Sequence, residues 1–199
     1  MNKKTYHHGD LRTALIEKGI EVISEKGVAA LSLRKLAQAC GVSEAAPYGH
    51  FANKNDLMNA IESHASNKLV TALKKSVEKT GETPEGLMEL GCAFVMFFVH
   101  NPTYFGLIYD HLGIEAGGEH EYEPYDFIFG FMQKVFNNIN HPPELRRLTF
   151  FAQFSFIQGL ALFSLLVDNY DAAAKEDAVR KVLSTNHLLL SNNINKEPN

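Results

Sequence analysis

Cysteine and histidine are the side chains best suited to metal binding and nucleophilic chemistry, and the chain contains two cysteines and nine histidines. Cys40 and Cys92 form no CxxC motif and no Cys/His ladder, so neither a disulfide framework nor a structural zinc site is expected. His7 and His8 are adjacent, have no third ligand nearby in the sequence, and cannot easily share one ion. We therefore expect no metal and no cofactor.

Sequence motifs of common catalytic sites are also missing. The chain has no GxSxG nucleophile elbow, no GxxxxGK[ST] phosphate loop and no HExxH motif. These absences favour a binding protein over an enzyme. Two kinds of binding protein fit at this point: a nucleic-acid-binding protein, or a helical module that binds other proteins.

Charge is distributed unevenly along the chain. The net charge is −4, yet residues 1–60 hold 8 Lys and Arg against 6 Asp and Glu, so the acidic excess lies in the later residues. A small basic module joined to an acidic body is typical of a protein whose first part meets a polyanion. The N-terminus has no apolar stretch after its lysines, which predicts no secretory signal and a cytoplasmic location.

Helical periodicity dominates the sequence, and no segment alternates as a strand does. The expected fold is therefore all-α, with about nine helices arranged as a three-helix head and a C-terminal helical bundle. The predicted helices cover residues 10–26, about 32–40, 43–51, 53–79, 84–99, 102–110, 122–139, 142–169 and 171–190.

The second and third predicted helices are separated by a turn at Gly41. Ser32 and Ser43 are good N-cap residues, and glycine permits a turn in which a side chain would clash. Pro47 predicts a distorted or partly 3₁₀ start to the third helix. This order is the plan of a helix-turn-helix motif over about residues 32–51, although any pair of short helices can imitate it.

Several segments of the head resemble the DNA-binding domain of the TetR family. They are YHHGDLR at residues 6–12, LSLRKLA at 31–37, GVS at 41–43 and YGHFANK at 48–54. The resemblance covers roughly residues 6–69. It implies a sequence-specific transcriptional regulator, usually a repressor, that responds to a ligand and reads a palindromic operator as a homodimer. Residues 70–199 would then form the ligand-binding and dimerisation domain.

The same resemblance implies that residues 42–51 enter the major groove of DNA. Tyr48 and His50 match the phosphate-contacting pair of the family, and Gly49 stands where related heads often carry a longer, basic residue. Glu44 can accept a hydrogen bond from a cytosine amino group, and an apolar side chain can pack on a thymine methyl. The further phosphate-binding candidates are Ser32, Arg34 and Lys54, and the base-reading candidates are Ser43, Glu44, Ala45, Ala46 and Pro47.

Phenylalanine is concentrated after residue 90, which predicts either simple core packing or an aromatic pocket for an apolar or aromatic effector. The pocket candidates are Phe94, Phe97, Phe98, Tyr104, Phe105, Phe127, Phe131, Phe154, Phe156 and Gln158, with Tyr109, His100 and His111 as further polar groups. The segments 101–108 and 154–161 resemble a C-terminal domain found with such heads. Phe154 and Gln158 occupy positions where that domain typically has Trp and His.

Residues 148–167 form an uncharged run that is long enough to span a membrane. Gln153, Ser155, Gln158 and Ser164 interrupt its apolar surface, so we expect a helix buried between the body and a second subunit rather than a membrane span. By resemblance to the TetR family, the helices at about 142–169 and 171–190 would form a four-helix bundle with their copies in a homodimer.

Overall fold

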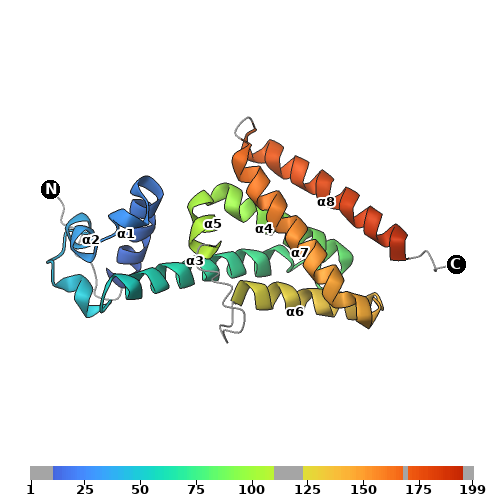
Figure 1. Ribbon diagram of the computed structural model, residues 1–199, viewed down its shortest axis with the longest axis horizontal. Helices are drawn as coiled ribbons and strands as arrows, with labels where there is room; N and C mark the ends of the chain where they lie inside the picture. Colours follow the sequence, from blue (N-terminus) through green and yellow to red (C-terminus); the bar gives the residue numbers. More distant parts are fainter. Residues whose placement is uncertain (1–10, 110–122, 168–169, 195–199) are drawn as a thin grey trace. The chain divides into compact units, whose positions relative to one another are not determined.

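The computed structural model describes residues 11–109, 123–167 and 170–194, and the side chains within them except those of residues 123 and 186–194. These residues form eight α-helices and two 3₁₀ turns, with no strand among them (Figure 1). The predicted all-α fold is confirmed, and the expected count of about nine helices is close. The elements are α1 (Leu11–Lys26), η1 (Val28–Ala30), α2 (Leu33–Ala39), η2 (Ala46–Gly49), α3 (Lys54–Ser76), α4 (Pro84–His100), α5 (Pro102–Tyr109), α6 (Glu123–Asn138), α7 (Pro143–Leu166) and α8 (Ala172–Ile194).

The largest difference from the predicted elements is the third helix, which is only the 3₁₀ turn η2. Its backbone bonds connect residues three apart, as between the Tyr48 N–H and the Ala45 carbonyl at 3.2 Å. Pro47 has no N–H to donate, which disfavours a longer α-helix here. Ala45, not Ser43, is the N-cap residue. Ser32 is the N-cap residue of α2, but its side chain makes no capping hydrogen bond.

The contacts divide the chain into two compact units, and the boundary falls inside α3 after Ser66. The first unit contains α1, η1, α2, η2, the N-terminal part of α3 and α5. The second contains the rest of α3 with α4, α6, α7 and α8. In the first unit, the Thr103 hydroxyl at the start of α5 donates a hydrogen bond to the Ser24 hydroxyl of α1 at 2.8 Å.

The core of the first unit is built from side chains at helical spacing on α1, α2 and α3. Leu15, Leu36, Leu57 and Ile61 are completely buried. A Cβ atom on Gly19 of α1 would come within 2.7 Å of the Ile61 side chain of α3, so the glycine allows these two helices to approach closely. Burial of several large apolar side chains, each worth about 1.5–3 kcal/mol, holds the small unit together.

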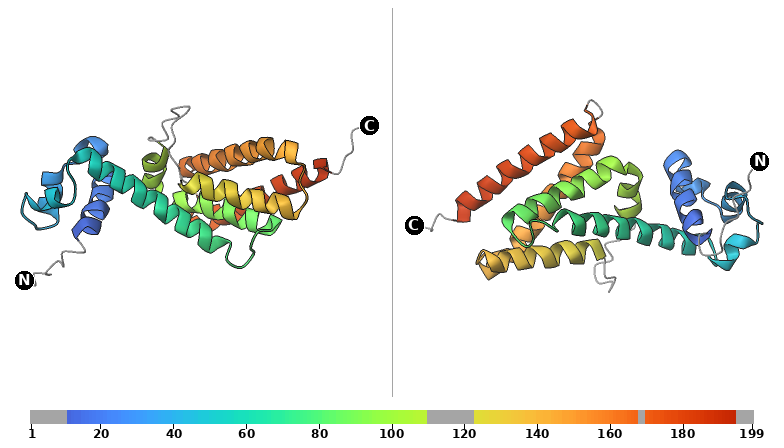
Figure 2. Two further views of the ribbon diagram at one scale, coloured as in Figure 1. Left: turned by 90° about the horizontal axis from the view of Figure 1, so that it is seen from below. Right: turned by 180° about the vertical axis from the view of Figure 1, so that it is seen from behind.

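In the second unit, α4 packs against both α7 and α8, and α6 packs against α7 and α4 (Figure 2). The helix α4 begins at Pro84, and its N-cap Thr83 accepts a hydrogen bond from the Gly86 N–H at 3.0 Å. Arg180 of α8 binds both carboxylate oxygens of Glu89 on α4, at 2.7 and 3.1 Å. This bidentate pair fixes how α8 lies along α4.

The two cysteines differ in exposure, which predicts a measurable difference in reactivity. Cys92 of α4 is buried, and burial raises the pKa of its thiol to about 11, whereas Cys40 is partly exposed. Because the thiolate is the reactive form, we expect a thiol reagent at pH 8 to label Cys40 at least 100-fold faster than Cys92. Labelling of Cys92 should accelerate as the pH rises toward 11, or when urea unfolds the protein.

Mass spectrometry of the labelled peptides measures this difference. A Cys40→Ser variant provides the control, because its remaining labelling reports Cys92 alone. Equal labelling rates of both thiols in the native protein would contradict the placement of Cys92 in the core.

Candidate functional site

The turn between α2 and η2 presents one polar face and one buried face. Gly41 has a φ of +69°, the left-handed conformation that glycine adopts most easily, so the predicted turn is confirmed. After it, Pro47 and Phe51 point into the core of the first unit, and Phe51 is only 1% exposed. The opposite face carries the candidate DNA contacts: Ser43, Glu44, Ala45 and Tyr48 are exposed, and Ala46 and His50 are half-buried.

Phe51 anchors this segment, whereas Val42 is only half-buried. The Arg12 guanidinium of α1 lies 5.3 Å from the centroid of the Phe51 ring, a cation–π contact between the first helix and the end of the turn. With Phe51 and Pro47 held in the core, the exposed side chains of residues 43–45 and 48 are presented outward on a fixed support. A protein needs side chains held outward in this way to contact base edges in a groove of DNA.

The candidate phosphate-binding side chains differ in how they are held. Tyr48 is 58% exposed, so its hydroxyl can reach a partner outside the protein. Lys54 begins α3, and its ammonium donates a hydrogen bond to the Val28 carbonyl at 2.9 Å. An ammonium has three hydrogens, so two remain for a phosphate. Ser32 lies half-buried at the N-terminus of α2.

Arg34 and Glu44, assigned from sequence to a phosphate and to a base, are paired with each other. The Arg34 Nε donates to a Glu44 carboxylate oxygen at 2.8 Å, and both side chains are well exposed to solvent. Exposed ion pairs of this kind contribute about 0–1 kcal/mol. Either side chain can therefore exchange its partner for DNA at small cost.

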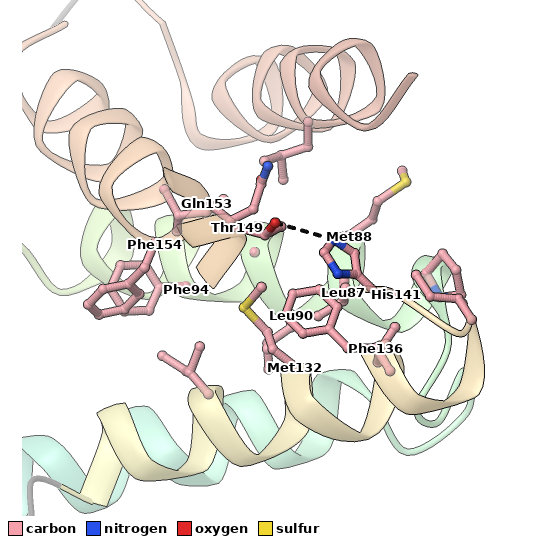
Figure 3. A pocket seen from close by; sticks show the side chains of 17 residues that line it. Leu87, Met88, Leu90, Phe94, Met132, Phe136, His141, Thr149, Gln153 and Phe154 are labelled. Atoms are coloured by element: carbon pink, nitrogen blue, oxygen red, sulfur yellow. Dashed lines mark hydrogen bonds between the residues drawn. The ribbon is translucent and has the colours of Figure 1, made fainter. Parts of the chain in front are cut away.

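A partly open cavity of about 170 Å³ lies in the second unit, and its lining residue Ile139 is exposed to solvent. The lining side chains come from α4, α6, the segment before α7, α7 and α8. They are Pro84, Leu87, Met88, Leu90, Gly91, Phe94, Ile128, Met132, Val135, Phe136, Ile139, His141, Thr149, Gln153, Phe154, Ile157 and Leu183. Figure 3 shows Phe94 and Phe154 on one side of this space, His141 and Thr149 on the other, and Met132 between them.

Of the pocket candidates chosen from sequence, the cavity brings together only Phe94 and Phe154, whose ring centroids are 6.2 Å apart. Phe97, Phe98 and Phe131 are buried in the core, and Phe127, Phe156 and Gln158 are half-buried away from the cavity lining. Tyr104, Phe105 and Tyr109 lie on α5 and group with the first unit. His100 is exposed at the end of α4, and His111 lies outside the described residues.

Three polar residues of the lining were missed: His141, Thr149 and Gln153. The sequence prediction started from aromatic clusters, whereas these side chains come from the turn before α7 and from the face of α7 that carries Phe154. The spacing 149, 153, 157 places Thr149, Gln153 and Ile157 on one helical face, and this pattern was the available signal.

The outward face of α7 is apolar and is not covered by the described residues of the chain. Leu148, Phe151, Leu162, Phe163 and Leu166 are between 47% and 71% exposed. The described part of the chain therefore does not supply the expected burial of this helix. By length and composition α7 could cross a membrane, as could α4 with α5 if they formed one broken span, but core helices of soluble proteins meet the same criteria.

The helix α2, the turn at Gly41 and the 3₁₀ turn η2 follow one another in the order of a helix-turn-helix motif and carry a polar face outward, an arrangement typical of DNA-binding transcriptional regulators. Residues 15–61 match the family model described as bacterial regulatory proteins, tetR family. The N-terminal part of the chain is therefore similar to the DNA-binding domain of this family.

The fold of most of the chain is similar to that of several solved structures. A protein of unknown function from Rhodococcus sp. RHA1 is 24% identical, with a TM-score of 0.71 over 91% of this chain and 97% of that one. The TetR-family regulator PfmR from Thermus thermophilus is 23% identical, with a TM-score of 0.60 over 85% and 94%. A transcriptional regulator from Aquifex aeolicus is 19% identical, with a TM-score of 0.66 over 88% and 98%.

Proposed function

We propose that this DNA-binding regulator is a repressor that binds a palindromic operator as a homodimer and releases it when an apolar or aromatic effector binds. The observation that carries the DNA-binding part is the outward face of residues 43–50, supported from behind by Pro47 and Phe51. In this proposal residues 6–69 hold DNA, and residues 70–199 bind the effector and form the dimer. The site of action is the cytoplasm, where the DNA is.

Dimerisation follows from the geometry of DNA and from α7. Two recognition segments must meet successive major grooves about 34 Å apart, which requires two copies of the head. The exposed face of α7 supplies the apolar surface that a second copy would bury. Ala152, Ser155 and Gly159 lie in the middle of this face and are exposed, so two helices could approach closely there. We assign the interface to α7 and α8, at residues 142–169 and 171–190.

Regulation requires the effector to distinguish two conformations of the protein. A ligand that binds the DNA-bound and free forms with equal affinity shifts nothing. We therefore propose that the effector occupies the cavity in the second unit and favours a conformation in which the two heads no longer fit the operator spacing. An effector that binds without changing the affinity for DNA would contradict this coupling.

One alternative is a helical protein-interaction module that no longer binds DNA. Gly49 favours it, because this exposed position of η2 offers no side chain to a phosphate or base. The two functions differ in what Tyr48 and Lys54 do, so substitution of these residues separates them.

Selection from a pool of random DNA duplexes tests the DNA-binding proposal. The native protein should enrich a palindrome, and Tyr48→Ala/Lys54→Ala should weaken binding to it by about 10- to 100-fold, as expected for two lost phosphate contacts. Because each lysine on a phosphate releases about one counterion, the double variant should also reduce the dependence of affinity on salt.

Lys75→Ala is the matched control, because Lys75 is an exposed lysine of α3 outside the head. This variant should leave affinity within about threefold of the native value. If the native protein enriches no palindrome, and its binding is absent or insensitive to salt, the interaction module becomes the better account.

A further inference from the structure

We propose that the cavity of the second unit binds a neutral, single-ring aromatic molecule that carries a hydrogen-bond donor, of the phenol type. This inference rests on the proposed function, because it names the chemistry of the effector. It draws on the volume of the cavity, the absence of charge in its lining, and the direction of the hydrogen bonds at its polar end.

The volume of the cavity suits a ligand with one ring. The cavity is partly open and measures about 170 Å³. An engineered apolar cavity of about 150 Å³ in another protein holds benzene. The space here therefore suits one six-membered ring with one or two further atoms.

The lining favours a neutral ligand. None of its seventeen residues is Asp, Glu, Lys or Arg. A carboxylate or ammonium placed there would lose part of its hydration without gaining a partner of fixed charge, which is unfavourable.

Aromatic and sulfur-containing side chains surround most of the space. Phe94 and Phe154 meet edge to face, with ring planes at 63°. Met88 and Met132 also line the cavity, and thioether sulfur makes favourable contacts with ring edges. These groups favour a flat ring over a saturated one of the same size.

The polar end specifies a donor on the ligand. His141 is buried, and its Nδ1 lies 3.1 Å from the Pro142 carbonyl oxygen, which can only accept, so Nδ1 carries the proton. In the neutral ring Nε2 is then an acceptor, and the Thr149 hydroxyl donates to it at 3.2 Å (Figure 3). The single hydrogen of the Thr149 hydroxyl is used in this bond, but the hydroxyl oxygen can still accept a hydrogen bond. A ligand O–H or N–H completes this chain of hydrogen bonds, whereas an ether or a hydrocarbon does not.

Isothermal titration of the full-length protein, without DNA, tests the inference with four probes: phenol, anisole, toluene and benzoate. We expect phenol to bind at least tenfold more tightly than anisole or toluene, and benzoate to show no binding. The double variant Thr149→Val/His141→Leu removes both the hydroxyl oxygen and the Nε2 atom, which Thr149→Val alone would leave free to accept from phenol. In this variant the preference for phenol should fall to within about threefold, while toluene binds at least as well as before.

Thr71→Val is the matched control, since Thr71 is an exposed threonine of α3 outside the cavity. It should keep the full preference for phenol. Retained toluene binding by Thr149→Val/His141→Leu shows that the cavity is intact in that variant. The inference is overturned if anisole binds as tightly as phenol, if benzoate binds best, or if the double variant leaves the preference unchanged.

A separate measurement of DNA affinity distinguishes failure of this inference from failure of the proposed function. A protein that enriches a palindrome but binds none of the ring probes refutes the ligand class alone. A protein that binds phenol but releases no DNA supports the ligand class and refutes the regulatory coupling.

Discussion

Replacing Phe163 and Leu166 with glutamate should convert the proposed dimer to a monomer and weaken its binding to a full palindromic site by about 100-fold or more. These side chains are 64% and 71% exposed on α7 in the single chain, so the change costs little within one subunit. Across a packed α7 interface the same change places four carboxylates in an apolar contact, which is strongly unfavourable. Loss of the dimer removes the gain in effective concentration that links two half-sites.

Sedimentation velocity measures the oligomeric state, and titration against the full site and a single half-site measures binding. Lys75→Glu is a matched control because it changes the charge of each subunit by the same amount, at an exposed position of α3. That variant should remain a dimer. If the Phe163→Glu/Leu166→Glu variant is still dimeric, α7 does not form the interface.

Phe51→Ala should lower the free energy of unfolding of the first unit by about 3–5 kcal/mol and abolish binding to the proposed operator. The ring of Phe51 is almost completely buried, and its removal leaves a cavity that the small unit cannot easily collapse. It also removes the contact with Arg12 and the support behind residues 43–50. Urea unfolding followed by circular dichroism measures the loss.

Tyr48→Ala separates the loss of a DNA contact from the loss of the fold. Tyr48 lies in η2, three residues before Phe51, and its side chain is exposed. This substitution should weaken DNA binding and change the free energy of unfolding by less than about 0.5 kcal/mol. A similar small effect of Phe51→Ala on unfolding would show that Phe51 does not anchor the turn.

Local signals in the sequence determined the helices and the class of the head. The apolar residues of α1 and α2 recur at helical spacing, and Gly27 and Gly41 end these segments with positive φ values of 75° and 69°. Such signals are local, because a helix and its stop depend on residues within one or two turns. The predicted range of α4 (84–99) consequently ends one residue before the observed helix. The predicted range of α6 (122–139) is one residue longer than the observed helix at each end.

Only the tertiary structure decided which side chains meet. Phe94 and Phe97 look alike in sequence, but one lines the cavity and the other does not. The pairing of His141 with Thr149 and that of Arg34 with Glu44 likewise depend on how separate segments pack. Periodicity fixes the face of a helix on which a residue lies. It cannot specify which other segment covers that face, because that choice depends on packing between elements distant in the chain.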